Sequence, residues 1–361
     1  MHGLLENEPA FLEVVWRHRK FSEALDLCRS FAALSPPGSM ILVVGASGSG
    51  KTTILKQLQV QLAGPVASWP RGEVPIAATS IANDVQGFFS SKNFVIRLLE
   101  EVRHPFYGVH SSPAPSLSPV IADIGLNQIR LSYSEPHLRI ALEKAFIHRK
   151  TRYVLLDEAQ HLLKTTTVGR AVNNLDSIKG LAERTGITVI LFGTFEILPI
   201  WNRSAQLNRR LQDVILHRYK DDIEQDMLDF EQLLETFSRK VPLADGLSLR
   251  DLNRLIYRQT FGIIGEIVRL LVGAQARACA RGSAHVSAKD LHEAAHSPAK
   301  LETLKRETLG GESLLFGVEQ IPPPMVASSR KVASPGRRGR RGRRLAVRDS
   351  VGTEPPEQFE G

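Results

Sequence analysis

The sequence predicts an α/β fold in which a five-stranded parallel sheet is followed by a C-terminal all-α domain. Up to about residue 220, short apolar runs rich in β-branched residues alternate with helical patterns. Such runs are typical of strands that are buried on both faces of a parallel sheet. From 222 to 297 the pattern is helical throughout, which indicates a separate small domain.

Strands and helices are expected to alternate along most of the first domain. The expected strands are 40–44, 74–80, 153–158, 187–192 and 214–216. The expected helices of this part are 10–34, 53–62, 91–102, 137–148 and 170–184. Five prolines make 104–136 the least regular segment. The second domain is expected to hold helices 222–239, 248–258, 264–281 and 287–296, the last capped by Ser287 with Asp290 three positions on.

These changes of pattern divide the chain into four parts. Residues 1–38 are expected to form an N-terminal helical extension that ends at a Ser-Pro-Pro-Gly breaker. Residues 39–220 form the α/β domain and 221–298 the helical domain. Residues 299–361 are predicted to be a linker and a basic, disordered tail, because Arg, Gly and Pro replace large apolar residues there.

The net charge of +8 is concentrated in the tail. Residues 328–361 carry nine basic and four acidic residues, which gives +5 and leaves +3 for the rest of the chain. This balance favours a polyanionic partner, although the body alone suggests one only weakly. Charge runs are usually solvated, so solubility or docking on another protein are alternative roles for the tail.

Cysteine usage and hydropathy indicate a cytoplasmic protein. The two cysteines, Cys28 and Cys279, exclude a disulfide framework and are expected to be small buried hydrophobes. The N-terminal segment lacks the apolar run of a signal peptide. No stretch approaches the ~18 consecutive apolar residues of a membrane span, so no membrane partner is expected.

A glycine-rich motif between the first strand and its helix predicts a nucleotide site. Residues 45–52 match the P-loop pattern G-x-x-x-x-G-K-[ST]. The glycines let backbone N–H groups converge on phosphates, and the following helix favours anions at its N-terminus. The expected nucleotide-binding residues are Gly45, Ala46, Ser47, Gly48, Ser49, Gly50, Lys51, Thr52 and Thr53. Lys51 would reach the β/γ-phosphates of ATP, while the Thr52 hydroxyl would ligate Mg²⁺.

Two carboxylates at the end of the third strand supply the second half of a hydrolytic site. Asp157 would complete the Mg²⁺ shell as a Walker-B acid, and Glu158 would polarise the attacking water. An apolar run ending in acids is a weak motif alone, but it becomes strong beside a P-loop. The presence of both acids favours ATP hydrolysis over binding alone.

Two further polar positions can be interpreted in more than one way. Thr194, at the tip of the fourth strand, would orient water beside the carboxylates, or it would cap the next segment. Arg209 or Arg210, just before the fifth strand, could reach a nucleotide bound by a neighbouring subunit, or they could be solvated surface arginines.

In this order the motifs resemble the AAA+ ATPase superfamily and, more specifically, the TniB family, the TnsC-like regulators of DNA transposition. The resemblance covers about residues 10–297 and rests on three further stretches, 157–162 (DEAQHL), 190–196 (ILFGTFE) and 206–210 (QLNRR). It implies an ATP-bound homo-oligomer, a ring or filament, on double-stranded target DNA. It also implies partnership with a DDE-type transposase and a TniQ-like targeting protein. By position, Thr194 matches the first sensor, and Arg209 or Arg210 matches the trans-acting arginine.

The chain departs from the family pattern in the helical domain. Similar proteins often carry an arginine second sensor where Glu266 follows Gly265 here, so Arg269, one turn later, is only a candidate. For DNA, the segment with Ser91 and Lys92 lies where family members line the DNA channel, and Arg97 is a weaker candidate. An ordinary capped surface helix explains the same residues equally well.

Other functions remain open at this point. A different AAA+ role, such as a secretion-associated ATPase or a replication initiator or loader, is one alternative. No membrane or peptidoglycan-binding pattern supports the first, and no winged-helix pattern after residue 297 supports the second. A nucleotide-gated DNA scaffold with incidental hydrolysis is a third reading, which the acid pair at 157–158 disfavours.

Overall fold

The computed structural model describes residues 17–84, 87–105, 107, 133–165, 168–205 and 210–316. A five-stranded sheet with the order β2-β3-β4-β1-β5 lies at its centre, and all four strand pairs are parallel. The strands are β1 (Met40–Gly45), β2 (Ile76–Ser80), β3 (Tyr153–Asp157), β4 (Thr188–Gly193) and β5 (Leu211–Leu216). The predicted fold class is therefore confirmed.

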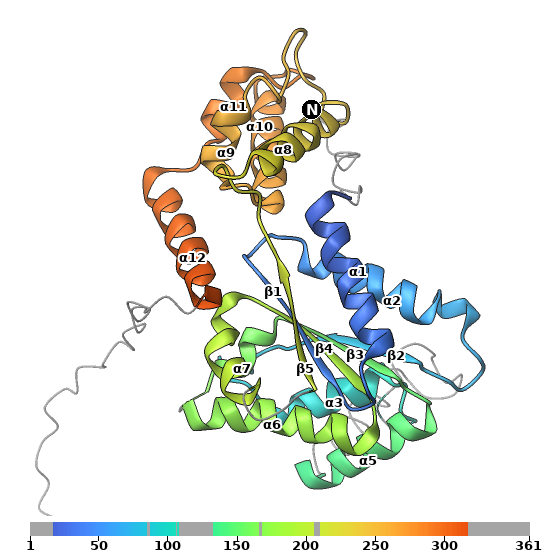
Figure 1. The fold of residues 1–361 in the computed structure, drawn as a ribbon. Coiled ribbons are helices and arrows are strands. Elements are labelled where there is room, and N and C mark those ends of the chain that lie inside the picture. Colours follow the sequence, from blue (N-terminus) through green and yellow to red (C-terminus); the bar gives the residue numbers. More distant parts are fainter. Residues whose placement is uncertain are drawn as a thin grey trace, which may run out of the picture. The chain divides into compact units, whose positions relative to one another are not determined.

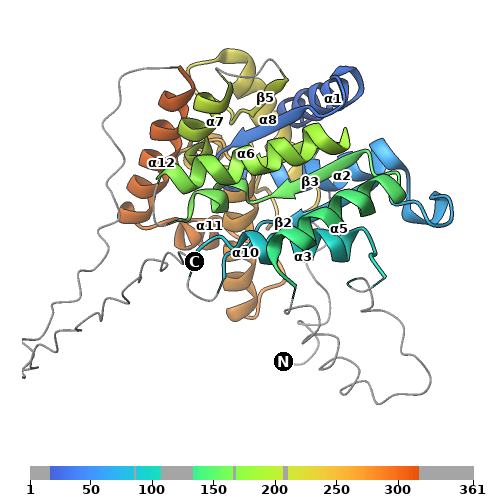
Figure 2. The same cartoon turned by 90° about the horizontal axis from the view of Figure 1, so that it is seen from below.

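Helices cover both faces of the sheet, as Figures 1 and 2 show. Alternate residues of β1 serve different cores, because side chains alternate along a strand. Leu42 belongs to the core that also contains residues of α3, α5, α6 and α7, whereas Ile41 belongs to the core that contains residues of α1 and α2. The helices are α1 (Arg19–Leu34), α2 (Lys51–Ala63), α3 (Ser91–Glu101), α5 (Glu135–His148), α6 (Val168–Thr185) and α7 (Leu198–Ala205).

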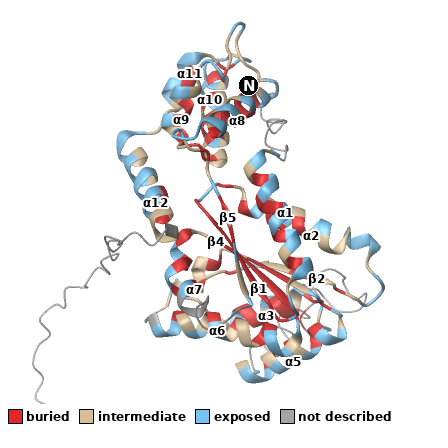
Figure 3. Ribbon diagram, in the orientation of Figure 1, coloured by how far each residue is buried: buried red, intermediate tan, exposed pale blue. Residues whose placement is uncertain are grey.

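The strands differ in burial according to their place in the sheet. β1 and β4 are buried at every residue, as Figure 3 shows, which explains their uninterrupted apolar sequences. β5 is an edge strand with only two buried residues, Val214 and Leu216. Its first half contains Gln212 and Asp213 and forms no apolar run, and for this reason the sequence pattern predicts only 214–216 of a strand that begins at Leu211.

The helical domain has a core of its own, built from α8 (Glu224–Ser238), α9 (Asn253–Thr260), α10 (Ile264–Ala280) and α11 (Ala288–Ala294). We call these four helices the lid. Ser287 and Asp290 form a capping box at the start of α11, as predicted. Among the described helices, none is both long and apolar enough to cross a membrane.

The linker predicted to start at 299 is wrong for its first part. Residues 299–316 belong to α12 (Pro298–Phe316), which follows the lid and packs on the α/β domain beside α7. Leu304, Leu314 and Leu315 of α12 join the same core as Leu42. Glycines at 310 and 311 and the weak amphipathicity of this segment hide the helix from sequence patterns. The tail from 317 onward lies outside the described residues.

Candidate nucleotide site

The P-loop connects the carboxyl end of β1 to α2, at the edge of the sheet where parallel α/β folds bind ligands. A side chain at Gly45 has no room, because a Cβ there would lie 2.7 Å from the Leu216 carbonyl oxygen. Gly48 and Gly50 have φ angles of 75° and 101°, which favour glycine. Gly50 also begins α2 without a side-chain cap, so the first amides of the helix are available to an anion.

Lys51 is held inside the loop that precedes it. Its Nζ donates hydrogen bonds to the carbonyl oxygens of Ala46 and Gly45, at 2.7 and 3.0 Å, and the residue is buried. Burial lowers the pKa of Lys51 to about 8, although the charges of Glu158 and Asp157 act in the opposite direction. The ammonium group is therefore poised where an added phosphate would stabilise its charge.

Thr52 and Asp157 meet across the sheet edge. The Thr52 hydroxyl donates a hydrogen bond of 2.7 Å to Asp157 Oδ2, so that the P-loop helix and the end of β3 share one contact. A hydroxyl and a carboxylate are hard oxygen donors, and these two fit a Mg²⁺ ion that keeps its remaining ligands as water and phosphate. Bound there, Mg²⁺ would neutralise charge on the β- and γ-phosphates of ATP.

Glu158 adopts a left-handed backbone conformation, with φ 58° and ψ 40°. Such a conformation costs a non-glycine residue about 1–3 kcal/mol and persists where its surroundings impose it. Here the Glu158 N–H donates to Asp157 Oδ1 at 2.9 Å, and Gln160 Nε2 donates to Glu158 Oε2. The strained backbone and these two hydrogen bonds together hold the Glu158 carboxylate in one position.

Thr194 follows β4, which lies between β1 and β3 in the sheet. The structure therefore places it between the P-loop and the two carboxylates, as expected from the sequence. Its amide donates a hydrogen bond of 3.1 Å to Gln160 Oε1. Its hydroxyl is buried and has no hydrogen-bond partner among the described residues, which is costly unless a ligand or water supplies one. Its sensor role remains a prediction.

The lid contacts the P-loop directly through the start of α10. The Gly265 N–H donates a hydrogen bond of 2.8 Å to the Gly48 carbonyl oxygen. Arg269, the candidate second sensor, instead lies 3.4 Å from the Glu266 carboxylate and is half exposed. Glu266 also pairs with His296 Nε2 at 2.8 Å. Within the described part of the chain, Gly265 of the lid therefore contacts the P-loop, whereas Arg269 pairs with Glu266.

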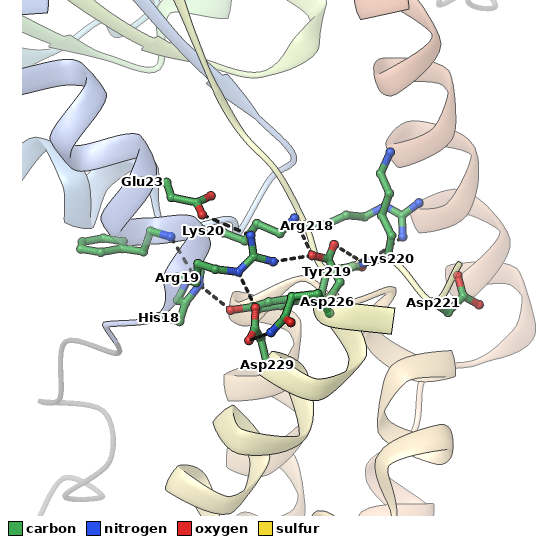
Figure 4. Close-up of polar contacts among 12 residues, drawn as sticks. His18, Arg19, Lys20, Glu23, Arg218, Tyr219, Lys220, Asp221, Asp226 and Asp229 are labelled. Carbon is green, nitrogen blue, oxygen red and sulfur yellow. Dashed lines mark hydrogen bonds and ion pairs between the residues drawn. The ribbon is translucent and has the colours of Figure 1, made fainter. Parts of the chain in front are cut away.

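Helix α1 contacts the lid through a group of charged side chains, which Figure 4 shows. Asp226 of α8 is almost fully buried and receives Arg19 Nη2 at 2.6 Å and Lys20 Nζ at 2.8 Å. Arg19 also pairs with Asp229. We call these four residues the clasp. Because α1 packs on α2, the clasp ties the lid to the P-loop helix.

His18 adds a neutral hydrogen bond to this junction. Its Nδ1 lies 3.0 Å from the Tyr219 hydroxyl and also accepts the Phe21 N–H at 3.4 Å. The Phe21 amide can only donate, so Nδ1 carries no proton and Tyr219 is the donor. Burial, helped by the nearby Lys20 charge, lowers the pKa of His18 to about 4, which keeps the ring neutral near pH 7.

Arg210 lies at the end of the sheet where the strands begin, whereas the P-loop lies at the end where they finish. It immediately precedes β5, where Leu211 pairs with Met40, whereas the P-loop begins beyond the pair Gly45–Leu216. The six-residue strand separates these two ends by about 20 Å at ~3.3 Å per residue. Arg210 is exposed, and its carbonyl oxygen accepts the Met40 N–H at 3.1 Å. Arg209 lies outside the described residues.

The candidate DNA contacts differ in how far they are engaged within the fold. The Ser91 hydroxyl donates to Glu135 at 2.7 Å and accepts from Arg139 Nη2 at 2.6 Å. These bonds join α3 to α5 and give Ser91 a structural role. Arg97 is exposed on α3, while Lys92 is partly buried. The cysteine prediction holds for Cys28, which is buried, but Cys279 is partly exposed.

Sequence reasoning missed Gln160 and Gly265 as parts of this site. Gln160 lies two residues after Glu158, inside the 157–162 stretch that carries the family resemblance, and this position is a signal that could have found it. Gly265 gives no local signal, because only the fold brings it to Gly48.

Comparison with known families agrees with this geometry. The model of a family described as an AAA domain matches residues 37–200, which span the P-loop, the carboxylates and Thr194. No curated protein matches the chain.

Solved structures share the fold at low sequence identity. Two structures of the ORC2 protein of Aeropyrum pernix are similar. One holds ADPNP and ADP, with 17% identity, a TM-score of 0.55, and coverage of 88% of this chain and 80% of that one. The other, an ADP form, has 18% identity, a TM-score of 0.50 and coverage of 82% and 75%. A Walker-type ATPase of Pyrococcus abyssi has 15% identity, a TM-score of 0.48 and coverage of 87% and 78%.

Proposed function

Because the chain folds as an AAA+ P-loop NTPase, we propose that it is an ATP-driven regulator of DNA transposition that acts as a homo-oligomer on double-stranded DNA. ATP would bind between the P-loop and the lid, and Glu158 would polarise the attacking water. The ATP-bound oligomer would mark target DNA for a DDE-type transposase, with a TniQ-like targeting protein as a further partner. Hydrolysis stimulated by these partners would dismantle it.

The position of Arg210 is the observation that supports a homo-oligomer. About 20 Å of strand lies between Arg210 and the P-loop of its own subunit, which is more than an arginine side chain spans. If Arg210 acts on ATP, this distance requires that the nucleotide be bound by another copy of the chain. A guanidinium supplied in trans would stabilise the charge that develops on the transferred phosphoryl group.

The role in transposition is supported by sequence resemblance. The stretch from Leu191 to Arg210 (LFGTFEILPIWNRSAQLNRR) is more specific than a P-loop and resembles the TniB family. Arg97, exposed on α3, is the side chain that we propose for phosphate contact. Lys92, partly buried on the same helix, is a second candidate.

A second candidate function is replication initiation or loading. The specific observation in its favour is the likeness in fold to the ORC2 protein, at a TM-score of 0.55. Both functions use ATP-dependent assembly on DNA, so ATPase measurements do not separate them. Capture of a purified DDE transposase by the ATP-bound protein on duplex DNA would favour transposition. Loss of helicase loading in cells that lack this chain would favour the second candidate.

Mixed oligomers test the composite site. Lys51→Ala chains keep the trans arginine but lose their own site, and Arg210→Ala chains have the opposite defect. Each variant alone should turn over ATP at a few per cent of the wild-type rate or less, since a trans arginine contributes about 10³-fold or more. Their equimolar mixture should recover about a quarter of wild-type turnover, because random mixing completes one interface in four.

The outcomes of this experiment are distinct. Full activity of Arg210→Ala alone would exclude Arg210 as the trans arginine, and the same mixture made with Arg209→Ala would then test the neighbouring candidate. Inactivity of the wild-type protein, with or without duplex DNA, would exclude an ATPase function. Glu158→Gln should bind ATP and remain on DNA far longer than the wild type.

A further inference from the structure

The side-chain amide of Gln160 bridges the ends of two neighbouring strands. Its Oε1 accepts the Thr194 N–H at 3.1 Å, after β4, and its Nε2 donates to Glu158 Oε2, after β3. One side chain therefore contacts both the water-activating candidate and the sensor candidate. The position was not among the site residues expected from the sequence.

The orientation of this amide is imposed by its partners. A backbone N–H can only donate, so the oxygen of Gln160 must face Thr194. Its NH₂ group must then face Glu158, which as a carboxylate can only accept. No other neutral side chain of this length offers an acceptor and a donor on one planar group, so the bridge is specific to glutamine.

The turn that carries Gln160 is held firmly. It belongs to η2 (Ala159–Leu163), where His161 Nδ1 donates to the Ile81 carbonyl oxygen at 2.7 Å. Asn174 Nδ2 of α6 donates to the Leu162 carbonyl oxygen at 3.1 Å. A side chain at Gly193 would crowd this turn, because a Cβ there would lie 3.3 Å from Ala159 Cβ and 3.4 Å from Gln160 Oε1.

We propose that Gln160 is a positioning residue for ATP hydrolysis, which fixes the Glu158 carboxylate at a set place relative to Thr194. This inference rests on the proposed ATPase function. The bridge occupies Oε2 of Glu158 and leaves Oε1 to accept a proton from water. It also engages the Thr194 amide but not its hydroxyl, which stays without a partner among the described residues. The Glu158 carboxylate and the Thr194 hydroxyl would then both be available to contact one water.

Two substitutions separate the two halves of the bridge. Gln160→Ala removes both hydrogen bonds. Gln160→Glu keeps the size of the side chain and an acceptor for Thr194, but it replaces the donor to Glu158 with a second carboxylate. We expect Gln160→Ala to lower kcat about 10- to 100-fold and Gln160→Glu to lower it at least as much. The dissociation constant of ATP should change less than about threefold in both, because neither bond involves the P-loop.

The matched control is Gln61→Ala, an exposed glutamine on α2, which should match the wild type in kcat and affinity. A double-variant cycle adds a readout that a purely structural role would not move. In a Glu158→Gln background, Gln160→Ala should cause no further loss in single-turnover hydrolysis, because the residue acts through Glu158. Thermal melting verifies that each variant is folded, and Gln160→Glu remains informative if Gln160→Ala does not fold.

Three results would overturn the inference while leaving the ATPase function intact. The first is wild-type or raised kcat in both Gln160 variants. The second is a loss of ATP affinity that accounts for the loss of turnover. The third is a double variant whose loss of single-turnover hydrolysis equals the product of the losses of Gln160→Ala and Glu158→Gln. Absence of hydrolysis by the wild-type protein would instead remove the proposed function, and the inference with it.

Discussion

The Gly265 amide of the lid donates a hydrogen bond of 2.8 Å to the Gly48 carbonyl oxygen of the P-loop. The two backbones are so close that a Cβ at Gly265 would lie 2.5 Å from this oxygen and 2.8 Å from Gly48 Cα. The lid and the phosphate-binding loop are thus joined through main-chain atoms. Because the two backbones are in contact, a movement of the lid must displace the P-loop or break this hydrogen bond.

The first prediction concerns this contact. Gly265→Ala should weaken ATP binding about tenfold or more, which equals about 1.4 kcal/mol, because the added methyl group must push the lid from the loop. Equilibrium titration with a fluorescent ATP analogue measures the effect. Gly169→Ala is the control, since a Cβ there meets nothing within 4 Å. Equal affinity of the two variants would mean that the lid can shift without disturbing the P-loop.

The second prediction concerns pH. The pKa of Lys51 is about 8 without nucleotide, lowered by burial, and neighbouring phosphates should raise it. Below pH 8 the amine is charged in both states. Above pH 8 the nucleotide-bound form takes up a proton that the empty form has lost, so affinity should fall as pH rises, by at most tenfold per pH unit.

Calorimetry in buffers of different ionisation enthalpy measures this proton directly. Uptake should be close to zero at pH 7 and approach about one proton per ATP at pH 9. Lys56→Ala, an exposed lysine on α2, should leave the dependence unchanged. Affinity that stays constant from pH 7 to 9 would contradict the buried state of Lys51.

The third prediction tests α12 with a pair of adjacent glycines. A Cβ at Gly311 would lie 2.1 Å from Phe195 Cδ2, whereas one at Gly310 meets nothing within 4 Å. Gly311→Ala should destabilise the fold by about 1–3 kcal/mol. Gly310→Ala should stabilise it by about 0.5–1 kcal/mol, because alanine favours a helix. Urea unfolding compares the two, and identical midpoints would show that α12 does not pack on Phe195.

The same pair tests the link between α12 and the site. Phe195 directly follows Thr194, so Gly311→Ala should also lower ATP turnover relative to Gly310→Ala. Glu312, the next residue, is bound by Arg218 Nε at 2.8 Å, which gives α12 a second attachment after β5.

The fourth prediction concerns the clasp. Replacing Arg19 and Lys20 by alanine leaves Asp226 buried, with the Lys220 N–H at 3.1 Å as a hydrogen-bond donor among the described residues. An unpaired buried carboxylate costs about 3 kcal/mol or more, so the variant should melt earlier and release ATP faster. Arg29→Ala, which removes an exposed pair with Asp26, is the control. Unchanged nucleotide release would show that the clasp is not coupled to the site.

The clasp should also lose its effect in acid. Burial alone would raise the pKa of Asp226, but hydrogen bonds from Lys20, the Lys220 amide and Arg19 outweigh it and lower the pKa. The stabilisation is therefore present above the ordinary aspartate pKa and is lost as pH falls through the lowered one. Urea unfolding of the wild type and the double variant should accordingly converge at low pH.

The fifth prediction concerns the basic tail. Deleting residues 328–361 removes a charge of +5. If the tail contacts phosphates, the slope of log affinity for duplex DNA against log salt concentration should become shallower, while ATP turnover stays unchanged. Anisotropy titrations at several salt concentrations give the slope. An unchanged slope would assign the tail to another role.

Strongly apolar or glycine-rich stretches were predictable from the sequence. The Lys51 loop, the Asp157–Glu158 pair and Thr194 follow buried strands, and the carboxyl ends of parallel strands lie at the same end of the sheet. The edge strand β5 and helix α12 were harder, because half-exposed elements carry weaker periodicity. Arg269 was a candidate implied by the family resemblance, yet its guanidinium pairs with Glu266.

The fold class and the residues that follow each central strand could therefore be predicted from local patterns, because burial on two faces leaves a continuous apolar run. Which groups contact one another depends on how the elements pack. The bridge of Gln160 between Glu158 and Thr194, and the contact of Gly265 with Gly48, join residues from separate elements. Their partners are set by strand order and helix packing, which no local pattern encodes.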